Sequence, residues 1–175
     1  MTSLQGFTDG SYDYSHMYDI PDLHGSFPRF KFNKGSLLEF LHCHTKCKGF
    51  SALIEKTQLA GYYNDPQSTF TLFVPLSMTE CDAKNIDSYN AQQLLLLHSL
   101  DFKASYTFLI SSHVMYVNTR VSGEKILIEN LNTGTPTLNR CSRILGQQEV
   151  GKSMVYFIDK PLPLKNGNPM AHVSI

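Results

Sequence analysis

The residues whose types and spacing most suggest chemistry run from Gly146 to Ser153, in the stretch GQQEVGKS. This stretch matches G-x-x-x-x-G-K-[ST], the pattern of a loop whose backbone N–H groups hold nucleotide phosphates at the start of a helix. A loop of this kind would bind ATP or GTP. It needs a helix directly after the lysine and a buried parallel strand before the first glycine.

The sequence after this stretch does not favour a helix. Residues 154–158 read MVYFI, an apolar run of strand length that is rich in β-forming residues, and Pro161 follows shortly after it. Nucleotide binding through residues 146–153 is therefore a remote alternative. We interpret GQQEVGKS as a polar connection between two strands, with bends at Gly146 and Gly151.

A second cluster has the side chains that bind zinc. The stretch LHCHTKC contains His42, Cys43, His44 and Cys47. On a helix the two cysteines share a face at i and i+4, whereas the two histidines point away from it. A zinc site would need further ligands brought in by the fold, from Cys81, Cys141 or His98. We expect partly buried thiols and surface imidazoles instead, and predict no metal and no cofactor.

His98 follows four leucines in the stretch LLLLHSL, on a helix that is expected to face the core. Two interpretations are open: the ring contacts a partner, or it is a core histidine that hydrogen-bonds to the backbone. No serine or cysteine lies in a local signature of an activated nucleophile. We therefore predict no catalytic residues and no enzymatic activity.

Length and charge limit the remaining classes. The chain has 175 residues, which suits one domain, and its 15 basic residues balance 15 acidic ones. No run of like charges marks a nucleic-acid partner. Neither a secretory signal nor an apolar span of about 20 residues is present, so we expect an intracellular protein with no membrane span and with free thiols.

Residues 1–34 are rich in aromatic residues but follow neither a helical nor a strand period. Disordered segments usually lack such side chains. We therefore predict an extended N-terminal arm that lies on another protein or on its own domain. The predicted partner-binding residues are those of the arm together with one residue of the domain: Tyr12, Tyr14, Tyr18, Phe27, Phe30 and His98.

Helices are predicted in the first half of the domain. Ser36 and Glu39 have the spacing of a capping box and start a helix that runs to about Cys47. A second helix over 50–60 should end at Gly61. A third is expected over 90–100, capped by Asn90 and Gln93.

Strands are predicted at 69–75, within 114–130 on both sides of a turn at Ser122-Gly123, at 143–145 and at 154–158. Helices followed by strands indicate an α+β domain with segregated layers.

Four stretches, in order, resemble fasciclin-like domains. KSMVYFIDKPLP is similar to the family's C-terminal strand, with Val155, Ile158, Asp159, Leu162 and Pro163 at matching places. GSLLEFLHCHTKCKGFSALIEKTQLAG resembles the two opening helices, TFTLFVP the Thr-x-Phe-x-Pro strand, and LLLLHSL the Leu-Leu-x-Tyr-His helix. The resemblance covers residues 35–164, between the arm at 1–34 and a tail at 165–175. It implies a wedge-shaped β-sandwich with helices packed on one side, and a binding module without catalysis.

The sequence departs from the family pattern where adhesion would be expected. Leu97-His98 replaces the Tyr-His pair, Lys152-Ser153 replaces an Asn-Gly turn, and Tyr156 replaces a histidine. We therefore predict a non-enzymatic interaction or structural module that docks onto other protein subunits through its arm. A minor subunit of a large assembly, such as a viral capsid in the virion, is the narrower prediction. Cell adhesion or matrix binding is the alternative.

Overall fold

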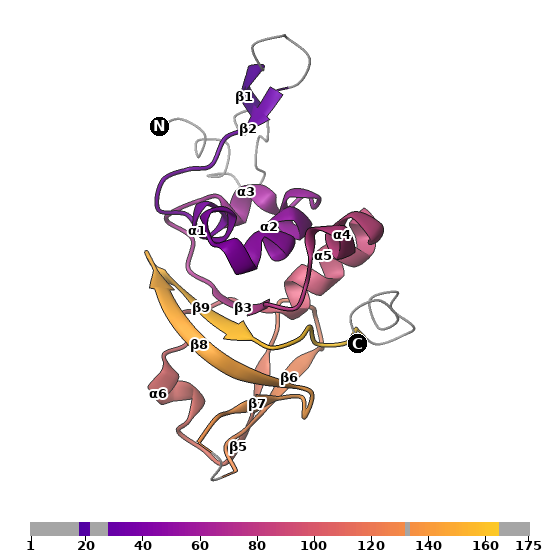
Figure 1. Ribbon diagram of the computed structural model, residues 1–175. Helices are drawn as coiled ribbons and strands as arrows, with labels where there is room; N and C mark the ends of the chain where they lie inside the picture. The colour runs from indigo at the N-terminus through magenta and orange to yellow at the C-terminus, as the bar shows by residue number, and fades with distance from the viewer. Residues whose placement is uncertain (1–17, 22–27, 132–133, 165–175) are drawn as a thin grey trace.

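The computed structural model describes residues 18–21, 28–131 and 134–164, and Figure 1 shows most of the helices gathered on one side of a folded sheet. The helical segments are α1 (Leu37–Cys43), the 3-10 turn η3 (Thr45–Cys47), α2 (Lys48–Glu55), α3 (Ala60–Tyr63), α4 (Glu80–Asn85), α5 (Ser88–Leu97) and α6 (Tyr106–Leu109). The strands are β1 (Tyr18–Pro21), β2 (Pro28–Phe30), β3 (Thr71–Pro75), β4 (Ser99–Leu100), β5 (Val114–Asn118), β6 (Lys125–Glu129), β7 (Thr137–Leu138), β8 (Ser142–Val150) and β9 (Ser153–Ile158).

Strands β3 to β9 form one mixed sheet in the order β4-β3-β9-β8-β7-β6-β5. Only β3 and β9 run parallel; the other neighbours in this sheet are antiparallel. The long strand β8 pairs with β7 through its first residues and with β9 through the rest. The sheet therefore has two halves, and β8 belongs to both because it pairs with β7 and with β9.

The two halves face each other across a buried core. Phe73 and Tyr156 from the β3–β9 half pack in one cluster with Val117, Ile126 and Ile128 from the β5–β6 half. This arrangement is the β-sandwich that the family resemblance implies. The α+β class is confirmed, with α1–α5 on one side of the sheet and the short helix α6 on the other.

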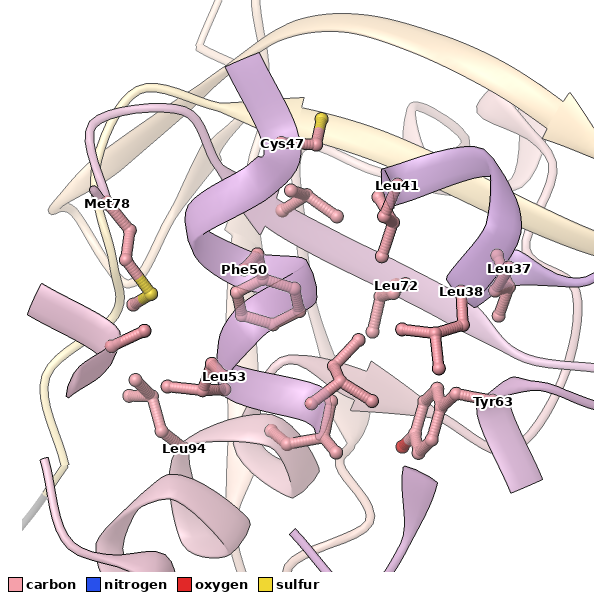
Figure 2. Close-up of a cluster of buried hydrophobic side chains, with 14 of the residues drawn as sticks. Leu37, Leu38, Leu41, Cys47, Phe50, Leu53, Tyr63, Leu72, Met78 and Leu94 are labelled. Carbon is pink, nitrogen blue, oxygen red and sulfur yellow. The ribbon is translucent and has the colours of Figure 1, made fainter. Parts of the chain in front are cut away.

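A second core lies between the helices and the β3–β9 half. Figure 2 shows Leu41, Phe50 and Leu53 of the helices gathered near Leu72 of β3, and all four are fully buried. Side chains alternate faces along a strand. Leu72 therefore packs on the helices while its neighbour Phe73 enters the sandwich core, so β3 separates two cores and all five of its residues are buried.

The first helix begins after Ser36 as predicted, but the second bond of the capping box is replaced by one to Gly35. Ser36 Oγ accepts a hydrogen bond from Glu39 N–H at 3.1 Å, and Glu39 Oε1 accepts one from Gly35 N–H at 2.9 Å. The helix is shorter than predicted, because α1 ends at Cys43 and His44 is extended before a separate 3-10 turn.

Two helix predictions are wrong in detail, and a further helix was not predicted. Gly61 lies inside α3 rather than ending the second helix, which stops at Glu55. The third helix starts after Asp87, whose carboxylate accepts from Asn90 N–H, so neither Asn90 nor Gln93 is its cap. Helix α4 was not predicted, although Thr79 and Asp82 form a complete capping box.

The strand predictions at 69–75, 114–130 and 154–158 are confirmed within a residue or two. Gly123, in the connection between β5 and β6, has a φ of +81°, which favours glycine. The strand expected at 143–145 is only the start of β8, which continues to Val150.

The described part of the arm forms a small ribbon, in which β1 and β2 pair antiparallel. Tyr18 lies in β1 and Phe30 in β2, while Tyr12, Tyr14 and Phe27 lie outside the described residues. The strands of this ribbon were not predicted.

The chain joins the domain immediately after the ribbon. Asn33 N–H donates to Asn64 Oδ1 at 2.8 Å, and Asn33 Nδ2 donates to the Asn64 carbonyl at 2.8 Å. Asn64 Nδ2 donates to the Lys31 carbonyl at 2.8 Å. Residues 31–33 are thus fastened to the domain before its first helix.

Candidate functional site

The stretch GQQEVGKS is the end of one strand and the start of the next. Its first five residues belong to β8, Gly151 and Lys152 form the turn, and Ser153 begins β9. Gly151 has a φ of +56°, whereas Gly146 lies at a shift of the β8–β9 register. The expected polar connection is therefore only two residues long.

The side chains that a phosphate site would use already have partners. Lys152 Nζ donates to Gln67 Oε1 at 2.7 Å, and Ser153 Oγ accepts from Phe70 N–H and donates to the Ser68 carbonyl. Since β9 and not a helix follows the lysine, no helix N-terminus is available to hold an anion. The nucleotide-binding alternative is wrong, because it requires a helix directly after Lys152 and the structure has a strand there.

The zinc-type residues do not converge. Cys43 is exposed, whereas Cys47 is fully buried, and burial raises the pKa of its thiol to about 11. The His42 ring stacks on Phe32 at 4.1 Å, and the His44 ring lies 5.3 Å from that of Phe157. Within the described ranges, no three His, Cys, Asp or Glu side chains are grouped to hold a metal ion.

His98 is a core residue with no exposed surface. Its Nδ1–H donates to the Leu94 carbonyl at 2.8 Å, and its Nε2 accepts from Leu162 N–H at 2.9 Å. Burial lowers the pKa of the ring to about 4, so it is neutral at pH 7. The core interpretation of His98 is confirmed, and the predicted partner contact fails because the ring reaches no surface.

A polar network that runs from the buried Tyr63 and Ser99 to the exposed Asp101 also has a structural role. The Tyr63 hydroxyl donates to Ser99 Oγ at 2.7 Å and accepts from Arg120 Nη1 at 2.9 Å. The Arg120 guanidinium lies 4.5 Å from the centre of the Phe70 ring and pairs with Asp101 at 2.9 Å. Burial raises the pKa of the Tyr63 hydroxyl, which therefore stays protonated. The network holds the β4 end of the sheet to α3.

Nucleophile activation has no geometric basis in the described part of the chain. Each hydrogen bond found there for a histidine ring nitrogen joins it to a backbone group, in His44, His98 and His113. An activated serine or cysteine would need such a nitrogen within hydrogen-bond reach. The hydrogen bonds of these histidine rings thus anchor the backbone.

Exposed apolar side chains gather in a different place. The described residues include eight large hydrophobic side chains that are exposed, and Tyr89 on α5 is the one that belongs to the helical layer. The other seven, here called the apolar end, are Phe102, Phe108, Ile110, Val114, Tyr116, Leu131 and Leu145. They belong to α6, β5, β8 and the loops next to α6 and β6, and Figure 1 shows α6 and β5 on the far side of β8 and β9 from helices α1–α5.

Three shallow hollows include residues of the apolar end, and the one at Leu131 is also lined by Glu129, Arg140 and Arg143. The other two have no Asp, Glu, Lys or Arg among their lining residues. One of these, of about 380 Å³, is lined by Tyr106, Ile110, His113 and neighbouring residues. The other is lined by Leu145 of β8 and shares Tyr106 and Thr135 with the first. Phe102 and Phe108 meet edge to face nearby, with ring centres 5.6 Å apart. The two hollows without charged lining residues can bury apolar side chains of a partner.

Sequence reasoning did not find the apolar end. One signal for it was present: residues 104–119, ASYTFLISSHVMYVNT, contain no Asp, Glu, Lys or Arg. Surfaces of soluble proteins usually carry such charges. A long uncharged run that includes a loop and an edge strand could therefore have indicated an interaction surface.

Comparison with known proteins agrees with this fold. The Fasciclin domain family model matches residues 45–164. Among solved structures, the FAS1 domain pair from the insect cell adhesion molecule fasciclin I matches with a TM-score of 0.59 and 17% sequence identity. The match covers 76% of this chain and 52% of that one, so the chain spans about half of the domain pair. No match was found among curated proteins.

Proposed function

The chain belongs to the fasciclin domain family, and on that premise we propose that it is a non-enzymatic module that binds other proteins through its apolar end. The proposal is carried by the uneven distribution of exposed large apolar side chains: of the eight in the described residues, seven belong to α6, β5, β8 and nearby loops, and one, Tyr89, belongs to the helical layer. Monomeric proteins rarely expose large contiguous apolar patches, and such patches mark interaction sites.

The composition of the apolar end favours a protein partner. Phe102, Phe108 and Tyr116 are aromatic, and aromatic residues are enriched in protein–protein interfaces, whose centres are depleted of charge. Small-molecule sites usually place a few polar or titratable groups inside a deep pocket. The hollows here are open, and the buried groups with shifted pKa values, such as His98 and Cys47, lie elsewhere.

The partner is proposed to be another subunit of a large assembly, and the N-terminal arm provides a second contact. The anchor at Asn64 supports this role, since it fixes where the arm leaves the domain. Deletion of residues 1–30 retains this anchor and should leave the domain folded. That the assembly is a viral capsid stays a prediction from the sequence.

Crosslinking mass spectrometry on the protein from its native source tests the proposal. Crosslinks to a repeated partner should start from Lys103 and Lys125, next to the apolar end, rather than from Lys48 on the helical side. Ile110→Lys should remove these crosslinks without changing the melting temperature. Tyr89→Lys, at the exposed apolar residue of the helical layer, is the matched control and should keep them. Crosslinks that survive Ile110→Lys contradict the proposal.

Cell adhesion is the second candidate, and the observation that favours it is the fold shared with an insect cell adhesion molecule. The two candidates differ in location: an adhesion protein is exposed at the cell surface, whereas an internal assembly subunit is not. Biotinylation of intact source cells with a reagent that does not cross membranes should label an adhesion protein. It should leave an internal assembly subunit unlabelled until the cells are lysed.

A further inference from the structure

The edge strand β5 has the geometry to accept another strand. In the sheet order, β4 and β5 are the two outermost strands. Strand β4 is two residues long, and the Ser99 carbonyl on its outer side accepts from Arg120 N–H at 3.0 Å. Strand β5 has five residues and pairs with β6 without a register shift. One edge is thus short and covered, and the other is long and regular.

The antiparallel pattern shows which backbone groups of β5 point outward. Thr119 N–H donates to the Glu124 carbonyl, and Asn130 N–H donates to the His113 carbonyl. Residues directly opposite each other alternate between pairs that exchange hydrogen bonds and pairs that do not. In this register, residues 113, 115, 117 and 119 bond to β6. The N–H and C=O groups of Val114, Tyr116 and Asn118 therefore face away from the sheet.

These outward groups have no partner in the part of the chain that the structure describes. Their side chains are exposed as well: Val114 by 49% and Tyr116 by 66%. Native proteins usually protect such an edge with lysine, proline, a bulge or a covering segment. Strand β5 has none of these among its own residues, VMYVN. An unprotected edge is a template for strand addition.

We propose that β5 pairs antiparallel with β5 of a second copy of this chain, centred on Tyr116. This inference deepens the proposed function, because it names the mode of contact and one partner of the apolar end. In this register Val114 lies opposite Asn118 of the second copy, and Tyr116 lies opposite Tyr116. Each of these pairs exchanges two hydrogen bonds, so all the outward groups of β5 are satisfied.

The distribution of charge supports a second copy as the occupant. Residues 104–119 carry no Asp, Glu, Lys or Arg, and Arg120 lies opposite Ser112 in the proposed register. No two like charges therefore face each other, although like charges directly opposite destabilise strand pairs. The two-fold arrangement also closes on itself. Because the β4 edge is covered, the association stops at two copies instead of continuing as a fibre.

Proline substitution at position 116 tests the pairing. Tyr116→Pro removes an outward N–H without removing a bond to β6, and edge strands tolerate proline at such positions. Tyr116→Thr is the matched control, because it also removes the aromatic ring but keeps the N–H. By sedimentation equilibrium, the full-length chain and Tyr116→Thr should show a dimer that grows with concentration. Tyr116→Pro should be monomeric at the same concentrations, with an unchanged circular dichroism spectrum.

A peptide experiment keeps the proposal testable if Tyr116→Pro fails to fold. The peptide of residues 111–119, SSHVMYVNT, should dissociate the dimer by occupying β5. Methylation of its Tyr116 nitrogen should abolish this effect. Methylation of its Val117 nitrogen, which would point away from the protein, should not.

A chain that is monomeric at every concentration overturns the pairing, and so does a dimer that Tyr116→Pro leaves unchanged. A dimer that both methylated peptides dissociate to the same extent also overturns the pairing. These outcomes are separable from failure of the proposed function, because crosslinks from Lys103 or Lys125 to a different protein would persist in a chain that does not dimerise.

Discussion

Acidification should destabilise the fold through His98. The ring has no exposed surface, and burial lowers its pKa to about 4, compared with 6.5 for an unperturbed histidine. The neutral form fits its site, because Nδ1–H donates to the Leu94 carbonyl while Nε2 accepts from Leu162 N–H. Protonation of Nε2 would place a donor against the Leu162 N–H donor, inside the core.

The sign of the effect follows from proton binding in the two states. Between pH 6.5 and pH 4 the unfolded chain binds a proton at His98 that the folded chain does not. The free energy of unfolding therefore falls as the pH falls through this window. At about 1.4 kcal/mol per pKa unit, the full loss below pH 4 is about 3 kcal/mol. From pH 7 to pH 5 the same linkage lowers the free energy of unfolding by about 2 kcal/mol.

Urea unfolding at pH 7, 6 and 5 measures this loss. The chain has no tryptophan, so circular dichroism is the suitable probe. His98→Asn should be less stable than the wild type at pH 7 by about 1–3 kcal/mol, since the Leu162 N–H loses its acceptor. This difference should shrink as the pH falls, because asparagine does not titrate. His113→Asn, at an exposed histidine, should keep the wild-type pH dependence.

Glu55 has the opposite influence, because burial raises the pKa of its carboxyl and so adds stability toward low pH. It is unchanged in all three proteins, so it cancels in the differences between them. If the free energies of unfolding of the wild type and His98→Asn run parallel from pH 7 to pH 5, the reasoning about His98 is wrong.

Four substitutions test other parts of the structure. In Gly49→Ala the new Cβ would lie 2.2 Å from the Met78 carbonyl oxygen, so stability should fall by about 3 kcal/mol; Gly123→Ala has open space and should lose only about 1 kcal/mol, through its positive φ. Lys56→Met removes an ammonium group that binds three carbonyls at the end of α4 and should cost about 1 kcal/mol in chemical unfolding. Lys152→Ala should change stability by less than about 0.5 kcal/mol, and isothermal titration should give the same signal with ATP before and after the change.

The parts of the fold that could be predicted have strong local signals. Residues 69–75 are mostly β-branched or aromatic and end in a proline, and Ser36 caps the helix that contains Glu39. Helix α4 was missed because Ala83 is its one buried residue, so the segment has no apolar period. Gly61 was misplaced because a glycine after an apolar run has the same sequence pattern whether it ends a helix or lies within one.

The candidate site was harder to predict because burial depends on the tertiary structure. Phe73 and Tyr116 both stand in short apolar runs, yet Phe73 is fully buried and Tyr116 is exposed. The difference arises from the sheet order, which places β3 between two cores and β5 at an edge. A single sequence does not give that order, so the apolar end could be recognised only after the strands were placed.

The burial of His98 also determines which surface can bind a partner. Leu97-His98 occupies the place of the Tyr-His pair in the family pattern, but the two residues are 5% and 0% exposed. His98 joins α5 to the segment after β9 through Leu94 and Leu162, so exposing its ring would break both hydrogen bonds. A partner that binds the folded domain must therefore use another surface. The apolar end can be covered without breaking any bond of the core, because its side chains and the outward groups of β5 are already at the surface.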